Sequence, residues 1–288
     1  MAPRPTFDLQ SHSTCSDGAL PPGAVVAAAR AAGVELLALS DHDTVDGVDE
    51  ALEAAAARGL GLVTATELSA IDGEREDLHV LGYGIDHRSP GLLDALERFR
   101  ADRGARAHRM ADALRETGLE LEFPDRGGRP VGRPHLAQAA FEHPANRMRL
   151  REEDIVNFSQ LLEAYLVPGR PGYRRRTTPT VEEAIDTIHA AGGVAVWAHP
   201  FWDVDDRDEV LALVDRFADA GLDGVEAFYI THTEEQTRLA AEHCAERGLL
   251  TTGSADFHGP EHPRFHAFRA FDLYGFAPHL GPIRSCVA

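Results

Sequence analysis

The sequence predicts an α/β fold with a parallel sheet and crossover helices, in a chain of 288 residues. Short apolar segments typical of strands alternate with longer capped segments typical of helices, and this alternation favours parallel strands. The strand-like segments are TFDL, ELLALSDHD, GLVTATE, DLHVLGY, GVAVWAHP, LDGVEAFY and LLTTGSADFH. The length suits one large α/β domain, or one domain with an insertion.

Helix signals separate these strand-like segments. Residues 20–33 carry Pro in the first turn and end at Gly, as helices prefer. Residues 45–59 are likewise helix-like and end at Gly, and residues 178–193, 207–221 and 233–248 each form a helix-like segment that leads into a strand-like one. We therefore expect each helix to cross over between neighbouring strands.

The alternation stops between about residue 92 and residue 170. Residues 91–118 and 151–166 are helical in pattern, with no strand-like segment between them. We predict a small helical insertion at residues 96–171, within a discontinuous α/β domain formed by residues 1–95 and 172–288.

Imidazole and carboxylate side chains recur at or just after the strand-like segments. Taken alone, any one of them is more often a helix cap or a hydrogen-bonded core residue. Together, at one end of a parallel sheet, they form a ligand set for borderline metals such as Zn, Mn or Fe. The set exceeds what one ion needs, so we predict a site for two or three divalent metal ions. It comprises His12, Asp17, His42, Glu67, His79, His199, Asp256 and His258.

Composition excludes several function classes. All 28 positively charged residues are Arg, so a Walker A P-loop and Schiff-base chemistry are excluded. The net charge of -19 disfavours a non-specific nucleic-acid binder, which needs a positive surface. No apolar stretch is long enough for a membrane span or a signal peptide, so we expect a cytoplasmic protein with no membrane partner. Three Cys give no disulfide framework.

Six ordered motifs resemble the PHP (polymerase and histidinol phosphatase) superfamily, most closely its stand-alone bacterial phosphoesterases. The resemblance extends from about residue 6 to about residue 260. VGRPHLA and YLVPGRPGY also resemble the substrate-side segment of that family. The six motifs are DLQSHSTCSDG, SDHDT, ATELSA, DLHVLGYG, AGGVAVWAHP and GSADFHG.

The resemblance implies a distorted (βα)7 TIM-like barrel with three metals at its mouth. By analogy, one metal takes His12, Glu67 and Asp256. A second takes Glu67, His79 and His199, with Glu67 bridging the two. A third takes Asp17, His42 and His258. Glu67, Asp17 and His199 are the implied catalytic residues.

Gln10 is the one departure from the family pattern. The family has His-x-His where this chain has Gln10-Ser11-His12. A neutral amide oxygen is a weaker ligand than imidazole for a transition metal. We therefore expect Gln10, if it is a ligand, to leave the first metal the weakest of the three.

The loops GRPH (132–135) and PGRPGYRRR (168–176) hold the candidate substrate-binding residues. Guanidinium groups match phosphate bidentately, so Arg133, Arg170 and Tyr173 are expected to bind a phosphate or to stack on a base, with His135 beside them. The alternative is that these residues only tie the insertion to the barrel.

These observations predict a metal-dependent phosphoesterase in which a metal-bound hydroxide attacks phosphorus. The expected substrate is a small phosphorylated molecule, a nucleotide of the 3',5'-bisphosphate type, or an RNA or DNA end. No stable protein partner is implied. Two alternatives remain: a metal-binding PHP module without turnover, or a metal-dependent amidohydrolase. The absence of Lys counts against the latter, since many such barrels use a carbamylated lysine.

Overall fold

The computed structural model describes residues 5–125, 127 and 131–287. It divides into a barrel unit, Met1–Leu96 with Pro179–Ala288, and an insertion unit, Glu97–Thr178. Each unit has its own buried core, so the two are described separately below. Within the described residues, no helix is both long and apolar enough to span a membrane.

The barrel unit is built on one seven-stranded sheet whose spatial order follows the chain. Backbone hydrogen bonds beyond the two edge strands close it: Leu9 N donates to Gly253 O (3.2 Å) and His12 N donates to Phe257 O (2.8 Å). The predicted α/β TIM-like barrel is therefore confirmed. Its strands are β1 (Phe7–Asp8), β2 (Leu36–Leu39), β3 (Gly61–Asp72), β4 (Arg75–Tyr83), β5 (Val194–Trp197), β6 (Gly224–Tyr229) and β7 (Leu250–Ser254).

One strand departs from the expected all-parallel arrangement. β4 runs antiparallel to both β3 and β5, whereas the other neighbours are parallel. β3 continues past Glu67 to Asp72 and turns at Gly73, whose φ of 56° favours glycine. Glu67 and His79 therefore lie within a hairpin and not after strand ends, and the expectation for these two was wrong. The antiparallel direction of β4 still places the start of that strand beside the carboxyl ends of the parallel ones.

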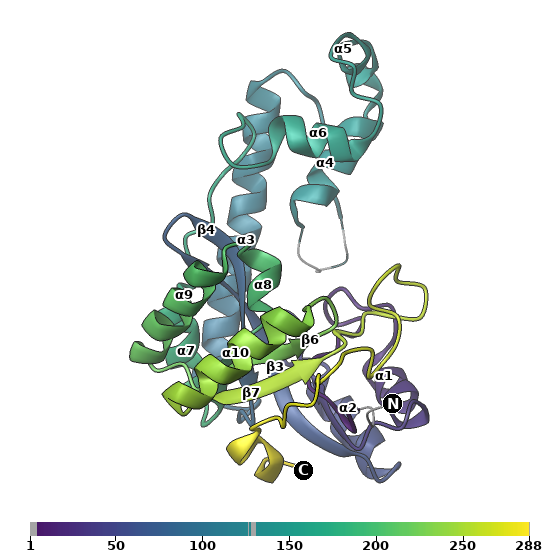
Figure 1. Cartoon of the computed structure of the whole chain (residues 1–288). Coiled ribbons are helices and arrows are strands. Elements are labelled where there is room, and N and C mark those ends of the chain that lie inside the picture. Colours follow the sequence, from purple (N-terminus) through teal and green to yellow (C-terminus); the bar gives the residue numbers. More distant parts are fainter. Residues whose placement is uncertain (1–4, 126, 128–130, 288) are drawn as a thin grey trace. The chain divides into compact units, whose positions relative to one another are not determined.

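Helices surround the strands on the outside of the barrel (Figure 1). Capping explains where two of them begin: Thr180 and Thr233 each accept a hydrogen bond from the backbone three residues later, in capping boxes. The second of these helices ends at Gly248, at φ 70°. The helices of this unit are α1 (Pro22–Ala31), α2 (Val48–Ala56), α7 (Val181–Ala190), α8 (Pro200–Asp203), α9 (Arg207–Asp219), α10 (Glu234–Arg247) and the 3-10 helix η2 (Gly281–Ser285).

The interior of the barrel mixes apolar and polar side chains. Tyr83 is fully buried and its hydroxyl donates to Leu9 O at 2.9 Å. Asp8 is also fully buried, and burial raises its pKa to about 7. The Asp8 carboxylate accepts hydrogen bonds from Ala255 N (2.9 Å) and Arg269 N (2.7 Å), so it joins β1 to the segment after β7.

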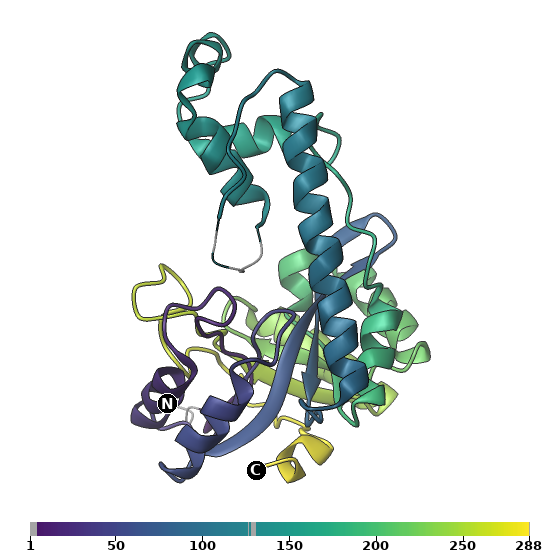
Figure 2. The ribbon, with the colours of Figure 1, turned by 180° about the vertical axis from the view of Figure 1, so that it is seen from behind.

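The insertion unit is helical, with α3 (Pro90–Glu116) crossing into it from the barrel unit (Figure 2). Its core packs α3 against α4 (Arg133–Glu142) and α6 (Phe158–Tyr165) through Met110, Leu114, Leu136 and Leu161. The buried Asn146 ties the segments together: its Oδ1 accepts from Glu120 N and its Nδ2 donates to Ala140 O. The remaining elements are the 3-10 helix η1 (Pro144–Asn146) and α5 (Arg147–Glu152).

Gly224 allows close contact between β6 and β7, which generates a stability prediction. A Cβ at this position would lie 2.7 Å from Leu250 Cβ and 2.8 Å from Leu250 O. Because the neighbour is backbone, it has no room to move, and we expect Gly224→Ala to lower the free energy of unfolding by about 1–3 kcal/mol. Urea unfolding measures it. Gly104→Ala is the control, since a Cβ there meets nothing within 4 Å beyond its chain neighbours and its own helix backbone, and alanine within a helix should not lower stability. Equal stability of Gly224→Ala and wild type would contradict this packing.

Candidate metal centre

The predicted ligand residues converge at the mouth of the barrel, where the parallel strands end. Asp17 and His12 lie in the segment after β1, His42 follows β2, and His199 follows β5. Glu67 and His79 come from the β3–β4 hairpin, and Asp256 and His258 follow β7. Residues separated by more than two hundred positions in the chain thus form one cluster.

Glu67 lies at the centre of this cluster and is fully buried. Its Oε1 is 2.9 Å from His79 Nδ1 and 3.3 Å from His199 Nε2. Its Oε2 is 3.1 Å from His12 Nε2 and 3.5 Å from His42 Nδ1. Burial alone would raise the pKa of Glu67, but the surrounding histidines hold that pKa well below its usual range.

Asp256 joins the cluster through His12. Its Oδ1 lies 3.1 Å from His12 Nε2, the same nitrogen that faces Glu67. Its other oxygen, Oδ2, accepts a hydrogen bond from the Tyr229 hydroxyl at 2.7 Å. The Tyr229 bond therefore orients the carboxylate and leaves Oδ1 directed at His12.

A more open group of ligands surrounds Asp17. Its Oδ2 is 3.7 Å from His42 Nε2, and its Oδ1 is 3.5 Å from His258 Nε2. The imidazole of His12 stacks between those of His42 and His258, with ring centroids 4.5 and 4.3 Å away. The side chain of Asp17 is 55% exposed, whereas Glu67 and His12 are fully buried, so solvent reaches the centre from the Asp17 side.

Buried atoms without partners test whether the cluster fits metal ions. Among the described residues, both ring nitrogens of His12, Oε2 of Glu67 and Oδ1 of Asp256 are buried without a hydrogen bond. Such groups are costly unless something else satisfies them. They are the nitrogen and oxygen donors that borderline divalent metals prefer. Ligand atoms of His12, Asp17, His42 and His258 lie within 4.8 Å of one another, as do those of His42, Glu67 and His79. The cluster fits a metal-binding site.

Two supporting acids, Asp41 and Asp43, hold the ligand-bearing loops, and neither was among the predicted site residues. Asp41 accepts hydrogen bonds from Ser13 N (2.7 Å), Ser13 Oγ (2.6 Å) and Ser16 Oγ (2.6 Å), which fixes the loop between His12 and Asp17. Asp43 accepts from Ser69 N at 2.9 Å and adopts φ 54°. Their place beside His42 in SDHDT is the available sequence signal.

His199 is held in a conformation that costs free energy. Its φ of 28° lies in the left-handed region, which non-glycine residues rarely adopt. The buried Glu226 carboxylate stabilises it, because Oε2 accepts from His199 N at 3.0 Å and Oε1 accepts from Ser254 Oγ at 2.6 Å. Burial raises the pKa of Glu226 to about 8. Asp203 Oδ2 lies 3.4 Å from His199 Nδ1, so the other ring nitrogen faces Glu67. A charged residue within the apolar strand GVEAFY was the signal for Glu226.

Gln10 is buried, and the contact of its side chain is with β7. Its Oε1 lies 3.2 Å from Ser254 Oγ, while its Nε2 is a buried donor without a partner among the described residues. Ser254 has one hydroxyl proton, and Glu226 is the closer acceptor. A ligand role for Gln10 stays a prediction.

The predicted substrate-binding residues all belong to the insertion unit. Arg133 begins α4, and His135 Nδ1 accepts a hydrogen bond from Gly132 N at 3.0 Å. Arg170 is exposed, and the Arg106 guanidinium lies 5.5 Å from the centroid of the half-buried Tyr173 ring. Their role toward a substrate stays a prediction.

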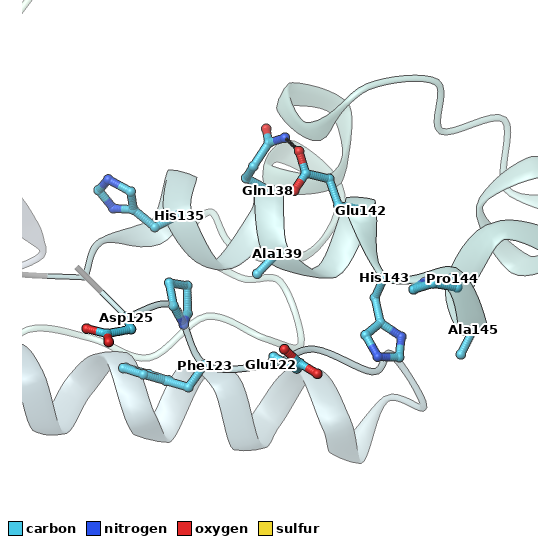
Figure 3. A pocket seen from close by; sticks show the side chains of 11 residues that line it. Glu122, Phe123, Asp125, His135, Gln138, Ala139, Glu142, His143, Pro144 and Ala145 are labelled. Atoms are coloured by element: carbon cyan, nitrogen blue, oxygen red, sulfur yellow. Dashed lines mark hydrogen bonds between the residues drawn. The ribbon is translucent and has the colours of Figure 1, made fainter. Parts of the chain in front are cut away.

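A pocket in the insertion unit includes one of these four residues, His135 (Figure 3). Its lining combines the Phe123 ring with the carboxylates of Glu122, Asp125 and Glu142. No arginine is among the described residues that line it. The described part of the lining is therefore acidic.

The chain resembles characterised bacterial enzymes over most of its length. It is 33% identical to a 3',5'-nucleoside bisphosphate phosphatase of Chromobacterium violaceum, over 88% of this chain and 87% of the relative. It is likewise 33% identical to a 5'-3' exoribonuclease of Haemophilus influenzae, over 88% of this chain and 90% of the relative. Both relatives cleave phosphate esters.

Solved structures share the fold. An amidohydrolase from Chromobacterium violaceum with bound sulfate superposes with a TM-score of 0.79 at 30% identity, covering 99% of this chain and 98% of its own. A protein of Bifidobacterium adolescentis assigned as a metal-dependent phosphoesterase superposes with a TM-score of 0.71 at 29% identity, covering 91% of both chains. Residues 8–158 match the PHP domain family. The resemblance predicted from six motifs is confirmed, and the chain belongs to the PHP domain family.

Proposed function

We propose that this phosphoesterase hydrolyses a phosphomonoester of a nucleotide of the 3',5'-bisphosphate type, using divalent metal ions. One observation carries the proposal: the buried Glu67 carboxylate faces four imidazoles, and buried ligand atoms around it lack partners. The phosphatase of Chromobacterium violaceum supports the choice of substrate. A 5'-phosphorylated RNA end is the second candidate, supported by the exoribonuclease of Haemophilus influenzae.

Three groups of side chains would hold two or three ions of Mn, Zn or Fe. The first group is His12, Glu67 and Asp256, the second is Glu67, His79 and His199, and the third is Asp17, His42 and His258. Contacts of 3.1 Å within the first group and of 2.9 and 3.3 Å within the second support this division. Glu67 contributes one oxygen to each of the first two groups.

The bound ions would supply charge neutralisation for the phosphate and a lowered pKa for a water molecule. The residues of the chain provide the geometry. Tyr229 orients Asp256, Glu226 fixes the peptide of His199, and Asp41 holds the loop that carries Asp17. Asp17 lies on the solvent side of the centre, so the phosphate would approach there.

Charge explains why the reaction would depend on metal. The centre contains the carboxylates of Asp17, Glu67 and Asp256, in a chain with a net charge of -19. A phosphate dianion is repelled by that field unless cations offset it. Arg133 and Arg170 would add positive charge and donate bidentate hydrogen bonds to the non-bridging oxygens of the phosphate.

Amide hydrolysis is the third candidate function, because the solved structure from Chromobacterium violaceum is named an amidohydrolase. The ligand set here contains no lysine, since the chain has none. Turnover of amide substrates against phosphate esters separates the two classes directly.

The first prediction concerns metal-dependent stability. Saturating Mn²⁺ should raise the melting temperature of metal-stripped protein by roughly 5 °C or more, because ligand binding to the folded state stabilises it by about 2.7 kcal/mol at a hundred times Kd. Glu67→Gln should lose most of this shift, whereas Glu53→Gln on the exposed face of α2 should keep it. Thermal unfolding with and without Mn²⁺ measures the effect. A full shift in Glu67→Gln would contradict the shared role of this carboxylate.

The second prediction tests the function. With Mn²⁺, the protein should release inorganic phosphate from adenosine 3',5'-bisphosphate, and Glu67→Gln should lower kcat/KM about 100-fold or more, since ligand loss disturbs two sites. Arg133→Ala should raise KM, while Arg151→Ala on an exposed part of the insertion should not.

Short RNAs with a 5'-phosphate form the second arm of the same assay. Release of mononucleotides from them, without phosphate release from the bisphosphate, would favour the RNA end. No hydrolysis of either substrate with Mn²⁺, Zn²⁺ or Fe²⁺ would favour a non-catalytic metal-binding module.

The third prediction concerns metal number and Gln10. Elemental analysis should find two or three ions per chain, with one fewer in His79→Ala. If Gln10 faces the first metal, Gln10→His should raise occupancy at limiting Mn²⁺, because imidazole is a stronger ligand than an amide oxygen. An unchanged titration would instead favour the contact of Gln10 with Ser254 as its role.

A further inference from the structure

Trp202 presents an aromatic surface beside the metal centre that the mechanism above does not use. It lies on α8, and its backbone N–H donates to His199 O at 2.8 Å. Its side chain is 48% exposed, whereas Trp197, the other tryptophan, is fully buried. A large aromatic ring that stays exposed does not contribute the free energy of burial to folding. Such exposed rings often mark binding surfaces.

Two residues of the segment after β7 complete this surface, which we name the Trp202 shelf: Trp202, Arg264 and Phe265. The Arg264 guanidinium lies 5.0 Å from the centroid of the indole, and the Phe265 ring lies 5.9 Å from it. In a strongly acidic chain, Arg264 forms no ion pair with any carboxylate among the described residues. Its charge is therefore available to an anionic or electron-rich ligand.

The Trp202 shelf is continuous with the metal centre. The Phe265 ring lies 5.4 Å from the His258 ring and 6.3 Å from that of Tyr229. The centroid distances of 5.9 and 5.4 Å limit the separation of the Trp202 and His258 rings to about 11 Å. A nucleotide spans such a distance between its base and its phosphates.

His262 holds the shelf in place. Its Nδ1 accepts a hydrogen bond from Phe265 N at 2.9 Å, and its ring stacks on Phe265 with centroids 5.0 Å apart. Rings that are ordered before binding lose less entropy when a ligand arrives.

We propose that the Trp202 shelf binds the nucleobase of the substrate by stacking, while a phosphate of the same nucleotide reaches the Asp17 side of the metal centre. Every base has a π face that stacks on an indole, and a guanidinium stacks on bases as well. The shelf would thus select nucleotides over phosphate esters that lack a base. This inference rests on the proposed function for its substrate class.

Steady-state kinetics with a base-free substrate provide the first test. We expect Trp202→Ala to raise KM for adenosine 3',5'-bisphosphate about tenfold, with kcat within about twofold of wild type. KM for the abasic analogue, in which hydrogen replaces the base, should not change. Trp202→Phe should restore most of the affinity, because a ring is restored. A similar loss for both substrates would mean a structural role and would overturn the proposal.

Arg264 is tested with a matched control at the other end of the barrel. Arg264→Ala should raise KM for the bisphosphate about threefold. Arg284→Ala removes another exposed arginine, from η2, which packs beside the start of β7, and should leave KM unchanged. Equal effects of the two substitutions would indicate general electrostatics and would count against the shelf.

Fluorescence separates failure of the shelf from failure of the proposed function. Adenosine has no phosphate to hydrolyse, yet its base should quench Trp202 saturably in metal-loaded wild type and in Glu67→Gln. The signal should vanish in Trp202→Phe, where only the buried Trp197 remains. Quenching through Trp202 without phosphate release from any nucleotide would overturn the proposed function and keep the shelf. Phosphate release with neither quenching nor a KM effect would overturn the shelf alone.

Discussion

The burial of one carboxylate, Glu67, is the constraint on which the barrel mouth depends. Four imidazoles from four separate segments approach it within 3.5 Å. A buried carboxylate is stable only when its charge is compensated, and the histidines alone leave several donor atoms unsatisfied. Metal binding satisfies both requirements, so the packing of this end of the barrel is adapted to cations and gains its full stability with them.

Residues outside the cluster hold the ligands that surround Glu67 in place. The strain at His199, with φ 28°, persists because the buried Glu226 carboxylate accepts its N–H. Glu226 is in turn bonded by Ser254 on β7, and Asp8 joins β1 to the chain beyond β7. The bonds that close the barrel are thus close in space to those that place the ligands. Closure and site geometry are therefore expected to be coupled, so that a change at the β1–β7 seam affects both.

Sequence patterns predicted the fold and the ligand types because each motif sits beside a strong strand signal, as SDHDT does after ELLAL. The antiparallel direction of β4 was not predicted, because the strand-like segments GLVTATE and DLHVLGY left a gap between Glu67 and Asp77 that hid the continuation of β3 to Asp72. The actual connection, Gly73–Glu74, is too short for a parallel crossover and fits only a hairpin. Glu226 and Tyr229 were also missed. Their partners, His199 and Asp256, are 27 residues away in sequence, and no local pattern reports such a contact.

The acidity of the chain limits how it can recognise a substrate. With a net charge of -19, long-range attraction cannot supply affinity for a polyanion, so recognition must come from short-range contacts. The candidates on the barrel unit are metal ions held at Glu67 and an aromatic surface at Trp202. Both act on a terminal group or a single residue of a nucleic acid rather than on a long backbone. A site of this kind is suited to single nucleotides or chain ends, and an internal stretch of RNA would meet mainly repulsion.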